Sequence, residues 1–314
     1  MKKKKALIYG ITGQDGAYMS KLLIEKKYDV EGISRGGNFV NLKKLQILDK
    51  VKINIIKSYG KNKLTKILKK NFDEIYFFGG VSSIVESYKN IDDTIDSQFA
   101  PIKTILSFIH NQKIKKTKLL FAGSSEIFAP TQKKINERST PNPQNPYGIS
   151  KSITFELIKF YREKFSLPVC TAIFFNHESS LRKEKYVIKK IIINLKKIQN
   201  KKINYFKLGN INIKRDWGWA PEYMIGCYKM LQKKKVEDFV IATGHSVSLK
   251  KIIIYLFKKF NLDWKKHIKI SSQNLRKNES IEIHADISKI KKILRWKPKF
   301  FYKDFLIKIY NNEI

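Results

Sequence analysis

The sequence has 314 residues, 42% of them hydrophobic, and a formal net charge of +37 at pH 7. That apolar content excludes a disordered chain, and no run reaches the roughly 18 consecutive apolar residues that a membrane helix needs. The positive charge is nearly all lysine, whereas proteins that read bases or clamp phosphates favour arginine. We therefore interpret the charge as a lysine-biased composition and predict no nucleic-acid partner and no membrane partner.

The chain begins with "MKKKKALIYGITG", a basic stretch followed by apolar residues, as in a secretion signal. The apolar run is short and leads into a glycine loop, so we predict a first strand instead. Cys170 and Cys227 lie far apart and form no metal or redox pattern, and we interpret both as small buried side chains. From these features we expect a cytoplasmic protein.

The first half of the chain alternates between strand and helix patterns. The strands are predicted at "ALIYG", "YDVEGIS", "KINIIK", "FDEIYFFGG", "KLLFAGSS" and "VCTAIFFN". Helical patterns lie between them, notably "TKILKKN", "DSQFAPIKTILSFIHNQ" and "YGISKSITFELIKFYREKF". This alternation predicts an α/β fold with a Rossmann-like, doubly wound parallel sheet.

The second half has a different rhythm of lysine-rich helices, short strands and loops, and it ends in the helical patterns "DISKIKKILRW" and "KDFLIKIYNN". We predict a dinucleotide-binding domain over residues 1–175 and a smaller, mainly substrate-binding portion over residues 176–314. No flexible linker separates them, so one compact body is expected.

A glycine-rich loop follows the first predicted strand, with Gly10, Gly13 and Gly16 three residues apart. Such glycines let the backbone approach a pyrophosphate at the start of a helix, whose free N–H groups favour an anion. A tight turn without a ligand is the plainer interpretation. We take the loop as a cofactor site, with the candidates Gly10, Thr12, Gly13, Gln14, Asp15 and Gly16.

Arg35 ends the second predicted strand, where dinucleotide folds contact the adenosine ribose. An acidic residue there favours NAD, and an arginine favours the extra phosphate of NADP. The residue predicts NADP rather than NAD, although a plain surface arginine would give the same pattern.

The segment "PYGISK" places Tyr147 and Lys151 one helical turn apart on the same face. A phenol titrates near pH ~10 in isolation, and a neighbouring ammonium together with a nicotinamide cation would favour the phenolate. Tyr147 is then a candidate general base, and Ser124, at a strand end, could hydrogen-bond the same substrate oxygen. A solvated Tyr–Lys pair is the alternative.

The chain resembles the extended short-chain dehydrogenase/reductase family and, more closely, the GDP-mannose 4,6-dehydratases. The resembling segments are "GITGQDGAY", "SSEIF", "NPYGISK", "FFNHESSLR", "LGNINIKRDWG", "DFVIATG" and "LRWKPK". Members of this family carry an acid two positions after the Ser/Thr, and Glu126 occupies that position.

The resemblance implies a reaction in three steps on a GDP-sugar. Tyr147 takes the proton of the sugar 4-hydroxyl as the C4 hydride passes to NADP. Glu126 then removes the C5 proton and helps water to leave from C6. Return of the hydride to C6 gives a 4-keto-6-deoxy sugar with no net redox change.

The resemblance also implies further contacts, residue by residue. His177 and Arg182 correspond to cofactor contacts, as do Tyr147 and Lys151. The implied substrate contacts are Ser82, Asn176, Lys190, Arg215, Arg276 and Glu279. Cationic donors suit a diphosphate, and a carboxylate accepts from ribose hydroxyls.

The sequence departs from the family around the adenosine half of the cofactor. Paired arginines and serines are replaced by "SRGGNFVN", and the "AAQS" loop appears as "GGVS". An Asp-Leu pair aligns with Lys61 and Asn62, and a tyrosine is replaced near Asp93. These changes leave the cofactor preference open, and also the choice between a homodimer and a homotetramer.

Three alternatives remain open at this point. The first is a dehydratase of another GDP-sugar, such as a GDP-heptose, which would share the same motifs. The second is a sugar-nucleotide reductase or 4-epimerase of the same fold. The third is a catalytically idle, basic binding protein of the same fold. Such a protein would not need the set Ser124, Glu126, Tyr147 and Lys151.

Overall fold

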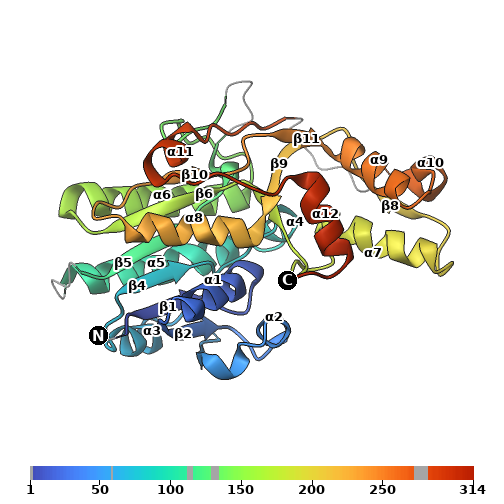
Figure 1. Ribbon diagram of the computed structural model, residues 1–314. Helices are drawn as coiled ribbons and strands as arrows, with labels where there is room; N and C mark the ends of the chain where they lie inside the picture. The colour runs from blue at the N-terminus through green and yellow to red at the C-terminus, as the bar shows by residue number, and fades with distance from the viewer. Residues whose placement is uncertain (1–2, 58, 112–115, 129–133, 272–281) are drawn as a thin grey trace.

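The structure is a computed structural model that describes residues 3–57, 59–111, 116–128, 134–271 and 282–314. Within these residues, seven parallel strands form the central sheet (Figure 1). In order across the sheet they are β10 (Phe239–Ile241), β6 (Val169–Phe174), β5 (Lys118–Ala122), β4 (Glu74–Phe77), β1 (Lys5–Tyr9), β2 (Asp29–Ser34) and β3 (Lys52–Ile55).

Helices cover both faces of this sheet. On one face α1 (Gln14–Glu25) packs against α8 (Ala220–Gln232). On the other face α5 (Ile91–Asn111) packs between α3 (Lys61–Leu68) and α6 (Pro146–Phe165). The layers confirm the predicted doubly wound fold.

The pleat of β1 explains the two layers. Ala6 and Ile8 enter the apolar core beneath α1 and α8, whereas Leu7 and Tyr9 enter the core beneath α3, α5 and α6. Successive side chains of a strand point to opposite faces, so a strand that is apolar throughout belongs between two helical layers.

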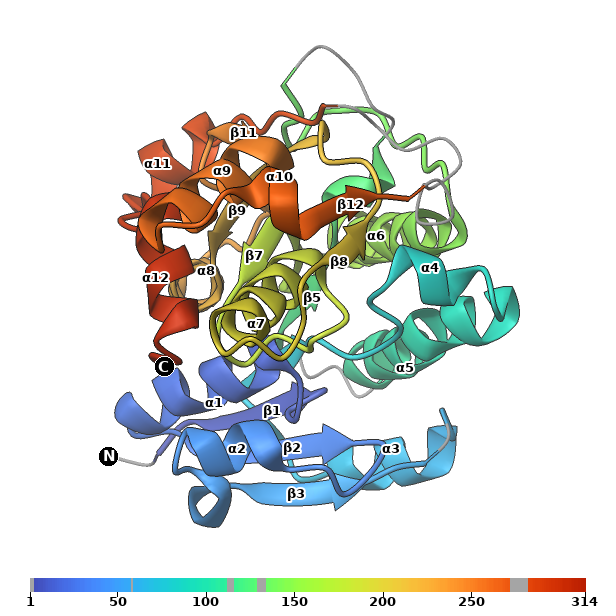
Figure 2. The same ribbon diagram turned by 90° about the vertical axis from the view of Figure 1, so that its right-hand side faces the viewer.

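The strand order reverses between β1 and β4, because the chain first adds β2 and β3 on one side and later β5 and β6 on the other. In such sheets ligands bind at this switch point, beyond the carboxyl ends of the strands. Figure 2 shows β1, β2 and β3 side by side below the second half of the chain.

The second half builds a smaller unit with its own core. Its strands are β7 (Asn176–Glu178), β8 (Phe206–Leu208), β9 (Lys214–Trp219), β11 (Ser246–Ser248) and β12 (Ile268–Ile270). Its larger helices are α7 (Val187–Gln199), α9 (Leu249–Lys259) and α12 (Tyr302–Tyr310). Leucine, isoleucine and aromatic side chains of these helices and of β8, β9 and β12 form one buried cluster.

Part of the second half returns to the central sheet. Helix α8 covers one face, and β10 extends the sheet beyond β6. Arg162 on α6 binds Asp238, just before β10, through two hydrogen bonds of 2.6 and 2.5 Å. Residues 176–314 are therefore joined to the sheet by a strand, a helix and a partly buried ion pair. The division at residue 176 stays a prediction.

The remaining described elements are short. They are α2 (Val40–Lys44), η1 (Leu48–Lys50), α4 (Ile84–Ser87), η2 (Ser125–Ile127), α10 (Trp264–His267) and α11 (Ser288–Leu294). In the described part of the chain, no helix combines the length and the apolar character that crossing a membrane requires.

Candidate active site

The glycine loop lies between β1 and α1, as predicted. Gly10 adopts φ +87°, in the left-handed region, and a β-carbon there would lie 2.9 Å from the backbone nitrogen of Gly79. At Gly16 a β-carbon would lie 2.3 Å from the carbonyl oxygen of Gly10. The loop therefore folds tightly against the first turn of α1 and leaves backbone exposed where a side chain would otherwise stand.

A cleft of about 370 Å³ opens at this loop, at the carboxyl ends of β1, β2 and β4. Eight predicted cofactor residues line it: Gly10, Thr12, Gly13, Gln14, Asp15, Gly16, Arg35 and Arg182. Ser82, predicted as a substrate contact, also lines the cleft. Residues from three separate parts of the sequence thus meet in one place.

His177 lies behind the loop rather than among the residues that line the cleft. It is buried on β7, and its Nε2 lies 3.0 Å from Oδ1 of Asp15. Burial alone would raise the pKa of Asp15, but the charge and hydrogen bond of His177 outweigh it and lower that pKa to about 2. His177 therefore fixes the start of α1, which positions the glycine loop.

The adenosine side of the cleft contains an interaction that the sequence did not reveal. Arg35 donates from Nη1 to the hydroxyl of Tyr59 at 3.2 Å, and Tyr59 donates to Oδ1 of Asp93 at 2.8 Å. Tyr59 follows β3 and Asp93 lies on α5, so the contact joins distant segments. It holds the guanidinium of Arg35 at the rim of the cleft.

The lining residues fit a dinucleotide cofactor. The glycine loop provides a cradle that a β-carbon would fill, next to the start of α1. Arg182 lies over the ring of Tyr186, with 3.7 Å between its guanidinium carbon and the ring centre. Its buried Nε has no hydrogen-bond partner among the described residues, although Glu178 lies 3.7 Å away. An anionic group in the cleft would meet a cation that is already positioned.

The four predicted catalytic residues lie together where β5 ends and α6 begins. Ser124 caps η2, and its Oγ accepts a hydrogen bond from the backbone nitrogen of Glu126 at 3.2 Å. The carboxylate of Glu126 accepts from Nδ2 of Asn145 at 3.0 Å. The strand end and the helix start therefore bring the acid and the Tyr147–Lys151 pair to the same side of the sheet.

Lys151 is buried on α6 beneath Tyr147. Its Nζ donates to the carbonyl oxygen of Ala122 at 2.5 Å and lies 5.7 Å from the centre of the Tyr147 ring. Burial lowers the pKa of the Lys151 ammonium to about 7. The predicted shared face is confirmed, and the lysine is anchored to the end of β5.

Tyr147 itself is a neutral phenol in the protein alone. Burial raises the pKa of its hydroxyl well above the ordinary value, and a hydrogen bond with Ser124 only partly opposes this effect. The sequence places an ammonium one helical turn from Tyr147, but Nζ of Lys151 donates to the carbonyl oxygen of Ala122. With a pKa of about 7, Lys151 is only partly charged at neutral pH. Lys151 alone therefore does not lower the pKa of Tyr147 enough for the phenolate to form.

The sequence matches the family model described as GDP-mannose 4,6 dehydratase over residues 7–308. The chain is 33% identical to GDP-mannose 4,6 dehydratase 1 of Arabidopsis thaliana over 324 residues, which covers 99% of this chain and 90% of the relative. It is 30% identical to the Homo sapiens GDP-mannose 4,6 dehydratase, with 98% and 91% covered. The chain belongs to the GDP-mannose 4,6-dehydratase family.

Solved structures of sugar-nucleotide enzymes share the fold of this family member. A UDP-glucuronic acid 4-epimerase from Bacillus cereus, in complex with UDP-glucuronic acid and NAD, aligns with a TM-score of 0.85 at 20% identity and covers 98% of each chain. A dTDP-glucose 4,6-dehydratase from Bacillus anthracis, in complex with NAD, gives 0.83 at 16% identity, with 98% and 96% covered. At these identities the likeness establishes the fold alone.

The predicted substrate residues of this dehydratase family member are more dispersed. Ser82 exchanges a hydrogen bond of 2.9 Å with the hydroxyl of Tyr186, and Asn176 is exposed at the start of β7. Lys190 donates to the carbonyl of Lys207 at 3.1 Å, and the buried Arg215 donates to that of Lys214 at 2.8 Å. Arg276 and Glu279 lie outside the described residues, so their roles stay predictions.

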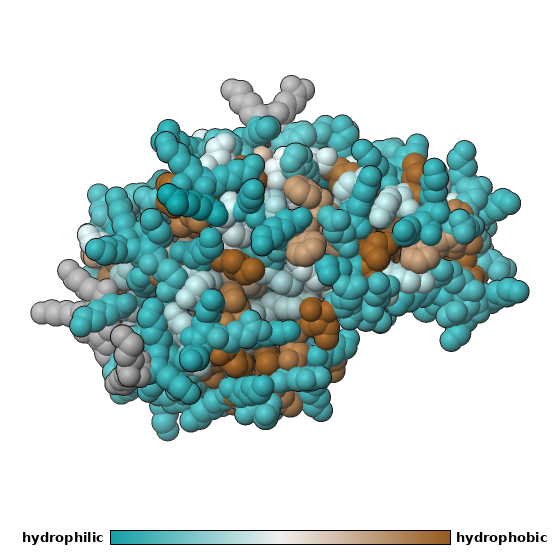
Figure 3. Space-filling view, viewed as in Figure 1, coloured by the Kyte–Doolittle hydropathy of each residue, from teal (hydrophilic) through white to brown (hydrophobic). Residues whose placement is uncertain are grey.

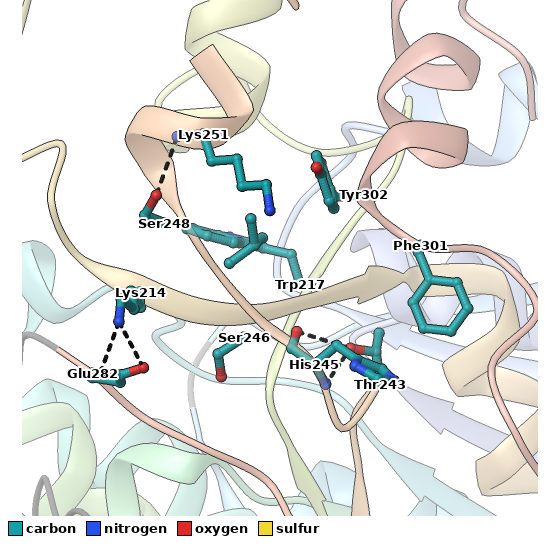
Figure 4. A pocket seen from close by; sticks show the side chains of 11 residues that line it. Lys214, Trp217, Thr243, His245, Ser246, Ser248, Lys251, Glu282, Phe301 and Tyr302 are labelled. Carbon is teal, nitrogen blue, oxygen red and sulfur yellow. Dashed lines mark hydrogen bonds and ion pairs between the residues drawn. The ribbon is translucent and has the colours of Figure 1, made fainter. Parts of the chain in front are cut away.

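A second cavity, of about 600 Å³, lies between β9, β11 and the starts of α9 and α12 (Figure 4). Among the described residues it shares no lining residue with the cleft at the glycine loop. Its hydroxyls are largely engaged within the protein, because Thr243 donates to Asp216, Ser246 to the carbonyl of Ile283, and Ser248 caps α9. Lys214 is paired with Glu282 at 3.2 Å. The cleft at the glycine loop, beyond the carboxyl ends of β1, β2 and β4, is therefore the better candidate site.

Proposed function

We propose that this protein is a lyase that converts a GDP-hexose, by default GDP-mannose, into its 4-keto-6-deoxy derivative. The observation that carries the proposal is Glu126, whose carboxylate accepts a hydrogen bond from Asn145, the residue that caps the helix of Tyr147. A reductase or 4-epimerase removes no proton from C5 of the sugar and needs no carboxylate beside its tyrosine. Membership of the dehydratase family supports the same conclusion.

In this proposal each residue of the cluster has one task. Tyr147 takes the proton of the sugar 4-hydroxyl, and Ser124 hydrogen-bonds the same oxygen. Lys151 anchors α6, the helix that carries Tyr147, to the end of β5. Glu126 removes the C5 proton and delivers it to the C6 hydroxyl, which leaves as water. When the hydride adds to C6, C5 takes up one proton, which balances the proton that Tyr147 took from the 4-hydroxyl. A bound nicotinamide cofactor supplies hydride acceptance at C4, hydride return to C6 and a positive ring that favours phenolate.

We propose NADP as that cofactor. The support is Arg35, a cation held at the rim of the cleft by Tyr59. Beside it Gly36 leaves open space, since an added β-carbon there would meet no atom within 4 Å. A ribose phosphate can enter such a space and pair with a guanidinium. Two solved structures of the same fold contain NAD, so NAD is run beside NADP in the assay below.

The deciding assay uses GDP-mannose carrying deuterium at C4, with NADP and with NAD in parallel. Mass spectrometry is expected to show loss of water with the deuterium retained at C6. A panel that includes a GDP-heptose tests the nearest alternative substrate. Failure of every GDP-sugar to lose water would overturn the proposal, and epimerised or reduced sugar would favour the reductase or epimerase alternative.

The variant Glu126→Gln tests the role of the carboxylate. Because an amide cannot take the C5 proton, water loss is expected to fall by about 10² or more while oxidation at C4 persists. Glu156→Gln, an exposed change on the same helix as Tyr147, is the control. Water loss by Glu126→Gln at the wild-type rate contradicts the assignment.

Two further features stay proposals. We propose a homo-oligomer, supported by exposed apolar side chains on α4 and α6, including Val85, Ile153 and Phe160, and by the exposed Tyr88 at the end of α4. We also propose a cytoplasmic location, supported by the buried free thiols of Cys170 and Cys227.

A further inference from the structure

We propose that Asn145 is a positioning residue for the elimination step, because its single amide group ties the catalytic carboxylate of Glu126 to the helix that carries Tyr147. This inference rests on the proposed dehydratase function and adds a residue to it.

The amide oxygen of Asn145 caps α6. Its Oδ1 accepts a hydrogen bond from the backbone nitrogen of Gly148 at 2.8 Å, and the residue has an extended backbone. This contact fixes the first turn of the helix, in which Tyr147 stands. Serine and aspartate side chains cap helices about as well as asparagine does.

The amide nitrogen of Asn145 contacts the acid. Its Nδ2 donates to Oε2 of Glu126 at 3.0 Å. The described residues provide no hydrogen-bond partner for Oε1 of Glu126, so that oxygen is left for the substrate. Among the residues that cap helices well, asparagine alone offers both an acceptor and an uncharged N–H donor at this reach.

The backbone around this contact is tightly packed. A β-carbon at Gly148 would lie 2.3 Å from the carbonyl oxygen of Glu126, so α6 and η2 are in direct contact. The backbone of Glu126 is held by Ser124 at the same time. With its backbone fixed, Glu126 can move its carboxylate only by rotation of the side chain. The hydrogen bond from the amide of Asn145 restricts that rotation and so fixes the carboxylate relative to Tyr147.

Two variants separate the cap from the contact with the acid. Asn145→Ser keeps a cap but is too short to reach Glu126. Asn145→Asp keeps the cap and places a carboxylate where the donor was. We expect an unchanged thermal midpoint for Asn145→Ser and, because two carboxylates then face each other at neutral pH, a lower one for Asn145→Asp. Both variants should form reduced cofactor at a near-normal rate. The elimination is expected to fall by tenfold to about 100-fold, because a shift of ~1 Å at a reacting group has an effect of that size.

The pH dependence of Asn145→Asp provides a signature that a purely structural role would not produce. Two facing carboxyl groups share a proton as the pH falls, and the shared proton again serves as a donor to Glu126. The elimination rate of this variant should therefore recover toward lower pH relative to that of Asn145→Ser. Of the other titratable groups, Tyr147 on α6 interacts with Glu126, and Arg182 and Tyr186 between β7 and α7 interact with Tyr147. They are common to both variants.

The experiment follows reduced cofactor by absorbance and water loss by mass spectrometry, with the wild type, Asn145→Ser, Asn145→Asp and Asn145→Ala in parallel. Selective loss of elimination in the serine and aspartate variants, with recovery of the aspartate variant at low pH, supports the proposal. Elimination at the wild-type rate in Asn145→Ser, or equal loss of both half-reactions, overturns it. A wild type that dehydrates no GDP-sugar overturns the proposed function instead, and this inference with it.

Discussion

At the scale of single residues, the site depends on polar side chains that hold one another rather than on isolated charges. His177 holds Asp15, Tyr59 holds Arg35 and Asn145 holds Glu126. In each pair the sequence predicted the residue that lies at the site. Its role, or the partner that holds it, is known only from the folded structure. The reason is that each partner comes from another strand or loop, and sequence spacing contains no information on such contacts.

The Asp15–His177 contact predicts a pH-dependent contribution to stability. The pKa of Asp15 is lowered from its usual 3.8 to about 2 in the folded protein. Because the folded-state value lies below the unfolded one, the contribution is present above pH ~4 and is lost as the pH falls to ~2. Asp15→Asn should therefore lower the free energy of unfolding by about 2 kcal/mol at pH ~5, and this difference should shrink below pH ~4.

Urea unfolding of both proteins at several pH values measures this difference. Asp29→Asn, at an exposed aspartate at the start of β2, is the matched control. A stability difference between the wild type and Asp15→Asn that stays constant from pH 7 down to ~2 would rule out the ion pair as its source.

At the scale of elements, the loop between β1 and α1 determines what the cleft can bind. The glycine spacing was interpreted correctly from the sequence, because a β-carbon at these positions would contact nearby backbone atoms. The start of α5 was predicted less well. The pattern indicated a helix from residue 96, but the helix begins at Ile91, and Oδ1 of Asn90 accepts from the backbone nitrogen of Asp93 at 2.8 Å. An asparagine that can cap a helix marks the helix start better than a weak apolar periodicity does, and Asn90 is such a residue.

The glycine loop also yields a binding prediction. In Gly16→Ala the new methyl group would lie 2.3 Å from the Gly10 oxygen and 2.8 Å from the Cα atom of Ile11, so the backbone of the loop must move. Overpacking of this kind costs about 1–3 kcal/mol, and the same loss from cofactor binding would weaken it roughly fivefold to 140-fold. Calorimetric titration with NADP measures the effect.

Gly37→Ala, in the same cleft, is the control, because the new methyl group would come no closer than 4.0 Å to a ring carbon of Phe39. Its affinity should stay close to that of the wild type. The thermal midpoints of both variants show whether the loop change also affects folding. Wild-type affinity in Gly16→Ala would mean that the loop does not approach the cofactor.

At the scale of the whole molecule, the fold class was predictable because strand and helix alternate along the first half. The seventh strand was not, since β10 has only three residues and comes from the second half of the sequence. The surface seen in Figure 3 is largely hydrophilic, in keeping with the lysine-rich composition. Against that background, the apolar residues that remain exposed on α4 and α6 are informative.

These exposed residues predict self-association. Ile149, Ile153 and Phe160 follow one face of α6 and are 39–49% exposed, and α4, α5 and α6 lie together in Figure 2. A second copy of the chain would cover this face. Light scattering of the wild type is expected to give two or four times the chain mass, and Ile153→Lys should reduce that mass.

The control is Ile254→Lys on α9, because Ile254 is 41% exposed and Ile153 is 40% exposed. It changes the same residue type by the same charge on another helix. A monomeric wild type, or equal effects of the two variants, contradicts an interface at α6.

The ion pair between Arg162 and Asp238 has a consequence for any attempt to divide this protein. A fragment that stops near residue 175 would keep the nucleotide-binding loop but would lose β10 and α8, which leaves the edge of β6 bare and Arg162 without its carboxylate. An unpaired strand edge of that kind invites other chains to add to it. A transfer of the cofactor-binding half into another enzyme would therefore have to include residues 220–241.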